Sequence, residues 1–333
     1  MKIFVTGATG FVGEQLVKKL AENPQNEVHI LVRSISKAKE MFSNLPNVFP
    51  FQGDLLEAEK IQKAMQECEQ AYHLAAQAKV WDKNPHSFYE MNVQGTLNIV
   101  QTAIKLRLKR IVLTSTAGVL GASLNGEMIT ENTPLRVPLS TEYEKTKAQA
   151  EKEVQKFLDK GVEVVTVNPT RVYGGGQRSQ SNAVTMLLEK YAQGKWRILP
   201  GNGKKIGNYV FIDDVVQGHL LAMQKGKNGE RYILGGENVS YEELFETFAE
   251  ITGKKRWLMP LPVPVMSGFA HLQMLKTRLI GSAPLITPPF VKKYLYDWQV
   301  SSQKAQKELG YTITPLKIGL QKTWEWLSGG SKG

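Results

Sequence analysis

The first half of the chain alternates short, continuous apolar runs with amphipathic stretches. The apolar runs are KIFVT, EVHILV, NVFPF, AYHLA, RIVLTS and EVVTV, and their continuity is typical of strands buried on both faces of a parallel sheet. Helical spacing marks the stretches between them: FVGEQLVKKLAE, EKIQKAMQE, MNVQGTLNIVQTAIKL and TKAQAEKEVQKFLDK. This alternation predicts an α/β fold with a doubly wound parallel sheet covered by helices on both faces.

The rhythm changes after about residue 168. Glycine-rich loops (RVYGGGQ, LPGNGKKIGN) precede mostly helical sequence, whereas YVFIDDVVQGHLLAMQ and RYILGG indicate a return to the sheet. We therefore predict one domain of residues 1–168 plus about 209–236, and a second of about 169–208 plus 237–330. The second domain is expected to be smaller, mostly helical and discontinuous, with the substrate bound in the cleft between the two.

The chain is basic, with a formal net charge of +11, which favours anionic ligands or surfaces. Its lysines and arginines are scattered, without a basic block or a zinc spacing, so no nucleic-acid partner is expected. Cys68 is the only cysteine, which excludes an internal disulfide and a cysteine metal cluster. We expect a cytoplasmic protein without a metal, because the apolar N-terminus is too short for a secretion signal and Glu14 interrupts it.

The most apolar later segment is LMPLPVPVMSGFAHLQMLKTRLIGSAPLITPPF. Its prolines, with His271, Lys276 and Arg278, argue against a membrane span. Its first half, residues 258–275, could form a lid over the substrate, a membrane-facing patch or a core helix of the second domain. We favour the core helix, so peripheral membrane contact is an alternative rather than the expectation.

Three glycines follow the first strand in TGATGFVG, directly before the first helix. Gly7 permits a tight turn, Gly10 leaves room for a pyrophosphate at the helix N-terminus, and Gly13 lets the helix pack closely on the strand. The position between a strand and a helix predicts a Rossmann-type dinucleotide site. The expected cofactor contacts in this turn are Thr6, Gly7, Gly10, Phe11, Val12 and Gly13.

The end of the second strand indicates which dinucleotide binds. An NAD site usually has an acidic residue there, but this strand ends LVRS, with Arg33 at the expected place. An arginine can pair with the 2′-phosphate of NADP, so we predict NADP (NADPH) as cofactor and keep NAD as the alternative. The other interpretation is a solvated surface arginine.

Further cofactor contacts are expected where the third and fourth strands end. In FQGDLLE, Asp54 could accept a hydrogen bond from the adenine amino group, with Leu55 beside it. In AYHLAAQ, the small residues Ala75 and Ala76 would let the cofactor lie close to the chain.

Reduction of a carbonyl requires a proton donor and a group that holds the oxygen. In YEKTK, Tyr143 and Lys147 stand four residues apart, on one face of a predicted helix. The same spacing occurs in YAQGK, where Gly194 interrupts the helix and no strand with terminal hydroxyls precedes, so we interpret that copy as surface structure. Before YEKTK, the strand in RIVLTSTAGVLG ends with Thr114, Ser115 and Thr116, and either Ser115 or Thr116 could bond the substrate oxygen.

These motifs together resemble the extended short-chain dehydrogenase/reductase family, that of NAD(P)-dependent epimerases and dehydratases. The resemblance runs through TGATGFVG, GDL, HLAA, MNVQGTLNIV, LTSTAGVLG, YEKTK, NPTRVYGGG and FIDDVVQGHLLAM. It implies an enzyme in which Tyr143 is the acid/base, Thr116 orients the carbonyl, and Lys147 holds the nicotinamide ribose and lowers the pKa of the tyrosine. It also places Pro169 and Thr170 at the nicotinamide end and leaves a homodimer open, while Thr114, where its strand ends at the cofactor cleft, is a further expected cofactor contact.

Family members that act on sugar nucleotides usually carry an arginine before the strand equivalent to YVFIDDV, where this chain has Gly207. TSTAGVLG and GERYILGGENVSYEEL look instead like the dihydroflavonol-reductase-like and 3β-hydroxysteroid-dehydrogenase-like branch. That branch implies an NADPH-dependent oxidoreductase that reduces a ketone or aldehyde of a fairly hydrophobic small molecule, reversibly. The alternatives are a sugar or sugar-nucleotide epimerase or dehydratase, and a non-catalytic dinucleotide-binding sensor; the retained tyrosine and lysine argue against the sensor.

Overall fold

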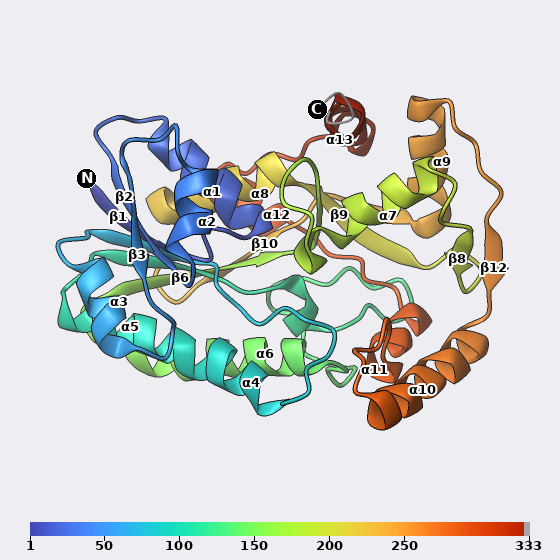
Figure 1. The fold of residues 1–333 in the computed structure, drawn as a ribbon, viewed down its shortest axis with the longest axis horizontal. Coiled ribbons are helices and arrows are strands. Elements are labelled where there is room, and N and C mark those ends of the chain that lie inside the picture. The colour runs from blue at the N-terminus through green and yellow to red at the C-terminus, as the bar shows by residue number, and fades with distance from the viewer. Residues whose placement is uncertain (330–333) are drawn as a thin grey trace.

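A seven-stranded parallel sheet forms the centre of the protein (Figure 1), whose computed structural model describes residues 1–329. Its strand order is β10-β6-β5-β4-β1-β2-β3, so the chain runs outward from β1 in one direction, returns, and continues in the other. This topology confirms the doubly wound sheet predicted from the continuous apolar runs. The strands are β1 (Lys2–Thr6), β2 (Glu27–Val32), β3 (Val48–Gln52), β4 (Gln70–His73), β5 (Arg110–Thr114), β6 (Glu163–Pro169) and β10 (Arg231–Leu234).

Helices pack on both faces of this sheet and give three layers (Figure 1). One face is covered by α1 (Phe11–Ala21), α2 (Ile35–Met41), α8 (Ile212–Lys225) and α12 (Gln303–Leu309). The other face is covered by α3 (Ala58–Met65), α5 (Gly95–Lys105) and α6 (Glu142–Val154). Because both faces are covered, the strand residues in between are almost entirely buried, which explains why the runs lack polar alternation.

A second region holds two small sheets. One has the order β11-β9-β7, and the other pairs β12 with β8. We expected the strand in YVFIDDV to return to the main sheet, but β9 pairs with β7 and β11 instead, because β7 follows β6 after one residue and offers it a parallel partner. Only α8 and β10 of segment 209–236 return to the main sheet. The strands are β7 (Arg171–Tyr173), β8 (Ile198–Pro200), β9 (Ile206–Phe211), β11 (Glu237–Ser240) and β12 (Met259–Leu261).

The larger helices of this region are α7 (Ala183–Ala192), α9 (Tyr241–Thr252), α10 (Val263–Ile280) and α13 (Leu316–Gly329). The division into two domains stays a prediction, and its end at residue 330 lies outside the described residues. Tyr191, in the second Y-x-x-x-K copy, packs in the core of this region against Phe245 and Phe248. Our interpretation of that copy as surface structure is therefore wrong for the tyrosine.

The apolar segment 258–275 does not form a core helix. It forms β12 and most of α10, of which only Met266, Ala270 and Thr277 are buried. The core interpretation fails because α10 packs along one narrow side while apolar residues occupy the other side too. Within residues 1–329, no helix is both long and apolar enough to cross a bilayer.

Short helical turns complete the described chain. Two of them, α4 (His86–Tyr89) and the π-helix η1 (Glu90–Gln94), lead directly into α5. The others are α11 (Pro288–Val291) and the 3-10 turns η2 (Ala117–Leu120), η3 (Gln155–Phe157), η4 (Gln180–Asn182) and η5 (Lys292–Leu295).

Candidate active site

The glycine turn between β1 and α1 has the geometry that a bound phosphate requires. Gly7 has a positive φ of 72°, which favours glycine. A Cβ on Gly13 would lie 2.1 Å from the Gly7 carbonyl oxygen, so only glycine allows this close approach. Gly10 is the N-cap of α1 and offers no side-chain acceptor, so the first N–H groups of the helix stay available for an anion. The turn therefore fits a dinucleotide pyrophosphate.

The other predicted cofactor contacts lie along the same edge of the sheet. Arg33 directly follows β2 and is exposed, while Asp54 follows β3 and accepts a hydrogen bond from the Leu56 amide at 3.1 Å. Ala75 and Ala76 follow β4 and are half-buried. Parallel pairing aligns the carboxyl ends of these strands, so the structure brings these residues to one rim. Leu55 and Phe11, by contrast, are buried in the cores.

A buried chain of hydrogen bonds leads from this turn to the helix that carries Tyr143, and sequence reasoning missed it. Thr6 Oγ1 lies 2.6 Å from His73 Nδ1, and His73 Nε2 lies 3.1 Å from Thr96 Oγ1. Thr96 donates to the Asn92 carbonyl oxygen at 2.7 Å, and Asn92 Nδ2 donates to Thr146 Oγ1 at 3.0 Å. The Thr6 hydroxyl thus has its proton directed at His73, and it also accepts a hydrogen bond from the Ala75 amide at 3.2 Å.

The same chain fixes the protonation state of His73. Because Thr96 spends its single proton on a carbonyl, His73 donates through Nε2 and accepts from Thr6 at Nδ1. Burial, together with a smaller effect of the Lys147 charge, lowers the pKa of His73 to about 3. His73 is therefore neutral at physiological pH, and Lys147 lies close enough to the end of β4 to affect it.

Tyr143 and Lys147 lie one turn apart near the start of α6. A capping box of Thr141 and Glu144 fixes that start. Lys147 is 1% exposed and forms no hydrogen bond or ion pair with another described residue. Burial lowers the pKa of its ammonium group to about 8, although the Glu151 carboxylate opposes this.

The pKa of Tyr143 differs from our expectation. Desolvation, together with a smaller effect of the neighbouring Glu144 carboxylate, raises the pKa of its hydroxyl to about 12. The expectation that Lys147 lowers this pKa is not met, because desolvation of the hydroxyl is the largest effect and the Glu144 carboxylate acts in the same direction. Tyr143 therefore keeps its proton throughout the neutral range.

The hydroxyls at the end of β5 differ in their partners. Thr114 Oγ1 lies 2.9 Å from His219 Nε2, which ties it to α8. Thr116 Oγ1 accepts a hydrogen bond from the Gly118 amide at 3.1 Å and keeps its own proton for donation. Ser115 Oγ is buried and has no hydrogen-bond partner among residues 1–329. Asn168 Nδ2 donates to the Thr116 carbonyl at 3.1 Å and links the ends of β5 and β6.

An arginine guanidinium lies beside Gly207, although the sequence pattern indicated that the arginine of the sugar-nucleotide enzymes is missing there. The guanidinium of Arg171 comes from β7, and a Cβ on Gly207 would lie 1.6 Å from its Nη1. The group also stands 5.4 Å and 5.3 Å from the ring centres of Tyr209 and Tyr241. Gly207 therefore makes space for a positive charge instead of removing one. Arg171 stands in NPTRVYGGG, directly after the predicted contacts Pro169 and Thr170, and its position there was the available signal.

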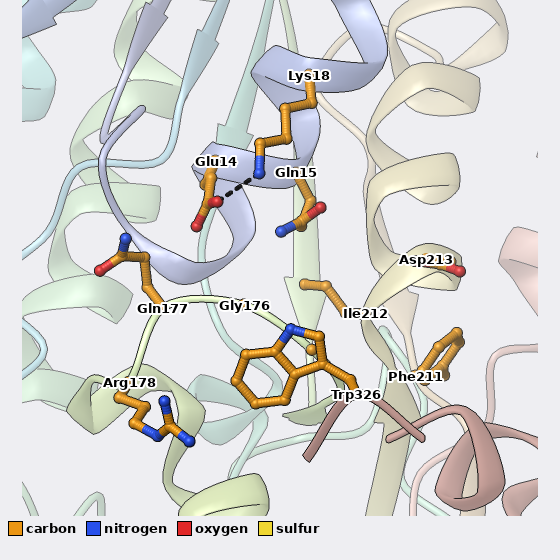
Figure 2. A pocket seen from close by; sticks show the side chains of 11 residues that line it. Glu14, Gln15, Lys18, Gly176, Gln177, Arg178, Phe211, Ile212, Asp213 and Trp326 are labelled. Carbon is orange, nitrogen blue, oxygen red and sulfur yellow. Dashed lines mark hydrogen bonds and ion pairs between the residues drawn. The ribbon is translucent and has the colours of Figure 1, made fainter. Parts of the chain in front are cut away.

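An open cavity of about 660 Å³ lies beside α1, separate from Tyr143 and Lys147 (Figure 2). It is lined by the outward side of that helix, by the loop after β7, by the start of α8 and by Trp326 of α13. In Figure 2, Lys18 and Glu14 pair on its upper wall. Neither Tyr143 nor Lys147 lines it, so we do not place the reaction there.

Comparisons with known proteins identify the class to which this fold and site belong. Residues 3–235 match the NAD dependent epimerase/dehydratase family. The chain therefore belongs to this family, and it is an NAD(P)-dependent enzyme of the extended short-chain dehydrogenase/reductase type.

Two curated relatives match nearly the whole chain. A putative dihydroflavonol 4-reductase of Synechocystis is 31% identical over 97% of this chain and 93% of its own length. The sterol demethylase protein B of Methylococcus capsulatus is 30% identical over 98% of both chains. Among solved structures, gox2253 is 29% identical with a TM-score of 0.82, covering 99% of this chain and 98% of its own. The UDP-glucose 4-epimerase of Thermotoga maritima is 25% identical with the same TM-score of 0.82, over 99% of this chain and 100% of its own.

Proposed function

We propose that this enzyme uses NADPH to reduce a ketone or aldehyde of a fairly hydrophobic small molecule. The observation that carries the proposal is the placement of Tyr143 one helical turn from Lys147 on α6, where the side chain of the buried Lys147 forms no hydrogen bond or ion pair with another described residue. A phenol that stays protonated at neutral pH suits donation to a developing alkoxide, which is the direction of reduction.

The nicotinamide cofactor, when bound at the glycine turn, supplies the hydride. Thr116 donates its free hydroxyl proton in a hydrogen bond that holds the carbonyl oxygen. Tyr143 transfers its proton to that oxygen as the alcohol forms, and the ammonium of Lys147 stabilises the phenolate that remains. The phenolate then takes a proton from water. Arg33 provides the preference for NADPH through the 2′-phosphate.

The names of several relatives support an apolar substrate. They refer to a sterol demethylase protein, to 3beta-hydroxysteroid and sterol-4-alpha-carboxylate dehydrogenases, and to a ketoreductase of a farnesyl-bearing quinoline oxide. Sterols and farnesyl chains are largely hydrocarbon. No motif in this chain identifies the substrate itself.

A screen of apolar ketones and aldehydes with the purified chain tests this proposal. We expect loss of NADPH absorbance with at least one class of carbonyl, and faster turnover with NADPH than with NADH. Absence of NADPH consumption with every carbonyl, although the cofactor binds, would contradict a reductase.

A sugar-nucleotide epimerase is the second candidate, and the Arg171 guanidinium beside Gly207 favours it. A buried guanidinium can hold a diphosphate by charge-assisted hydrogen bonds. An epimerase would interconvert UDP-sugars without net consumption of added cofactor. Chromatography of UDP-glucose and UDP-galactose after incubation with the enzyme separates the two functions.

A further inference from the structure

Helix α10 exposes apolar side chains on the side opposite the one that packs. Met266 and Ala270 are buried against Val291 of α11. The exposed residues recur at helical spacing along the other side of α10, and two of them, Leu272 and Leu279, are 66% and 76% exposed. We define the α10 patch as Val265, Phe269, Leu272, Leu275, Leu279 and Ile280.

Helix α10 lies at the outer edge of the molecule, with α11 between it and the body of the fold (Figure 1). Leu285, in the loop after the helix, is 81% exposed. Scattered apolar residues are normal on a protein surface, but a continuous apolar stripe marks a surface that another molecule covers.

The charge around the α10 patch points to an anionic occupant. Residues 251–296 contain seven lysines and arginines and no aspartate or glutamate. Lys276 and Arg278 are exposed on α10 itself, and Lys292 is exposed on η5, which contacts α10, whereas the neighbouring Lys293 is paired with Glu144. Long basic side chains can bury their stems beside apolar neighbours while their charged ends reach phosphate groups. Apolar residues flanked by cations are typical of helices that lie in the surface of an anionic membrane.

A second copy of this chain is a poorer fit for the α10 patch. A two-fold dimer places a surface against itself, so the basic segments of both copies would meet without a carboxylate between them. Like charges that face each other oppose association. An anionic lipid surface provides both the apolar interior and the counter-charge.

We propose that the α10 patch docks on an anionic lipid bilayer, with α10 lying in the membrane surface. The docking does not depend on the proposed reaction, but it would serve that reaction. Lys293 of η5 pairs with Glu144, the residue after Tyr143, so α10 is joined to the start of α6 through one turn and one ion pair. Docking therefore brings the candidate site toward a phase in which apolar carbonyl compounds dissolve.

Flotation of the purified chain with vesicles tests the proposal. We expect it to bind vesicles of phosphatidylcholine with about 30% phosphatidylglycerol at least tenfold better than vesicles of phosphatidylcholine alone, at roughly 150 mM salt. A protein that stays unbound with both kinds of vesicle overturns the proposal.

Two double variants separate the apolar and the charged contributions. Leu272→Asn with Leu279→Asn should lower the partition constant at least tenfold, whereas Ile318→Asn, at a 49% exposed site on α13, should leave it unchanged. Lys276→Gln with Arg278→Gln should lower it about fivefold per charge, whereas Lys63→Gln with Lys307→Gln should not. Circular dichroism confirms that each variant is folded.

Three results would contradict the docking proposal. The first is unchanged vesicle binding by the leucine variant. The second is equal loss in the matched controls, which would indicate attraction by net charge only. The third is a dimer in sedimentation velocity that the leucine variant abolishes while vesicles bind neither protein, which would assign the α10 patch to self-association. NADPH oxidation with a water-soluble carbonyl, measured without vesicles, should be the same in all folded variants, so the two proposals fail separately.

Discussion

Lys147 holds its charge inside the protein with no hydrogen-bonded counter-ion. Because burial lowers the pKa of its ammonium to about 8, the charge is present below that pH and is lost as the pH rises through it. Tyr143, with a pKa of about 12, titrates much later. We therefore predict that kcat for NADPH oxidation is constant near pH 7 and falls above about pH 8.

A pH profile from 6 to 10, roughly two units either side of that value, checks this prediction. A rate that stays constant to pH 10 contradicts the role given to Lys147. The variant Lys147→Met should be inactive, whereas Lys145→Met, its exposed neighbour on α6, should keep the wild-type profile.

Arg33 is exposed at the end of β2, and its side chain forms no hydrogen bond or ion pair with the other described residues. If it pairs with the 2′-phosphate, Arg33→Glu should raise the Kd for NADPH by roughly 10- to 100-fold, the value of a charge-assisted hydrogen bond, and change the Kd for NADH little. Fluorescence titration of both cofactors measures this. Arg107→Glu, in the loop before β5 at the amino ends of the strands, is the control. Equal losses of affinity for NADPH and NADH in Arg33→Glu would refute the NADPH preference.

The role of a single residue could be predicted from the sequence where only one residue type allows the required backbone conformation. In TGATGFVG, the tight turn predicted at Gly7 and the close packing of helix on strand predicted at Gly13 are both present in the structure. Arg171 was not predictable, because its guanidinium reaches Gly207 across a strand pairing that no local pattern encodes. The predicted direction of the Tyr143 pKa shift was wrong. This pKa depends on the desolvation of the site and on Glu144, and neither can be read from the spacing between Tyr143 and Lys147.

At the scale of elements, the π-helix η1 places Asn92 between β4 and α6. Asn92 is buried, accepts a hydrogen bond from the Gln77 amide at 2.7 Å and donates to Thr146 at 3.0 Å. Asn92→Ala leaves the Gln77 amide without its partner, so we predict a loss of about 2–3 kcal/mol in the free energy of unfolding.

Urea denaturation measures that loss. Gln94→Ala, two residues further along and exposed, should change the free energy of unfolding by less than about 0.5 kcal/mol. Equal stabilities of the two variants would show that the hydrogen-bond chain does not join these elements.

Helices and strands could be predicted where the pattern of apolar residues fits only one kind of element and one buried face. Continuous runs gave the strands of the main sheet to within a few residues, and the period of the amphipathic stretches gave α1, α3, α5 and α6. The pattern failed for α10, because a helix with apolar residues on more than one side does not reveal which side packs against a partner.

At the scale of the whole molecule, the candidate site is assembled by the parallel sheet. The ends of β1, β4 and β5 meet at one edge, and the chain from Thr6 through His73 and Asn92 connects that edge to α6. The alternation of strands and helices predicted this arrangement. The pairing of β9 with β7 in a small sheet was not predictable, because the apolar pattern of a strand does not say which neighbouring strand it pairs with.

The central claim is that the Tyr143 hydroxyl delivers a proton to a carbonyl oxygen while NADPH is bound to the same molecule. The most direct test is NADPH oxidation by Tyr143→Phe, with cofactor binding measured in parallel and Tyr191→Phe, from the second Y-x-x-x-K copy, as control. We predict a fall in kcat of about 10³-fold in Tyr143→Phe with an unchanged Kd for NADPH, and a near-normal rate in Tyr191→Phe. A wild-type rate in Tyr143→Phe would contradict the claim.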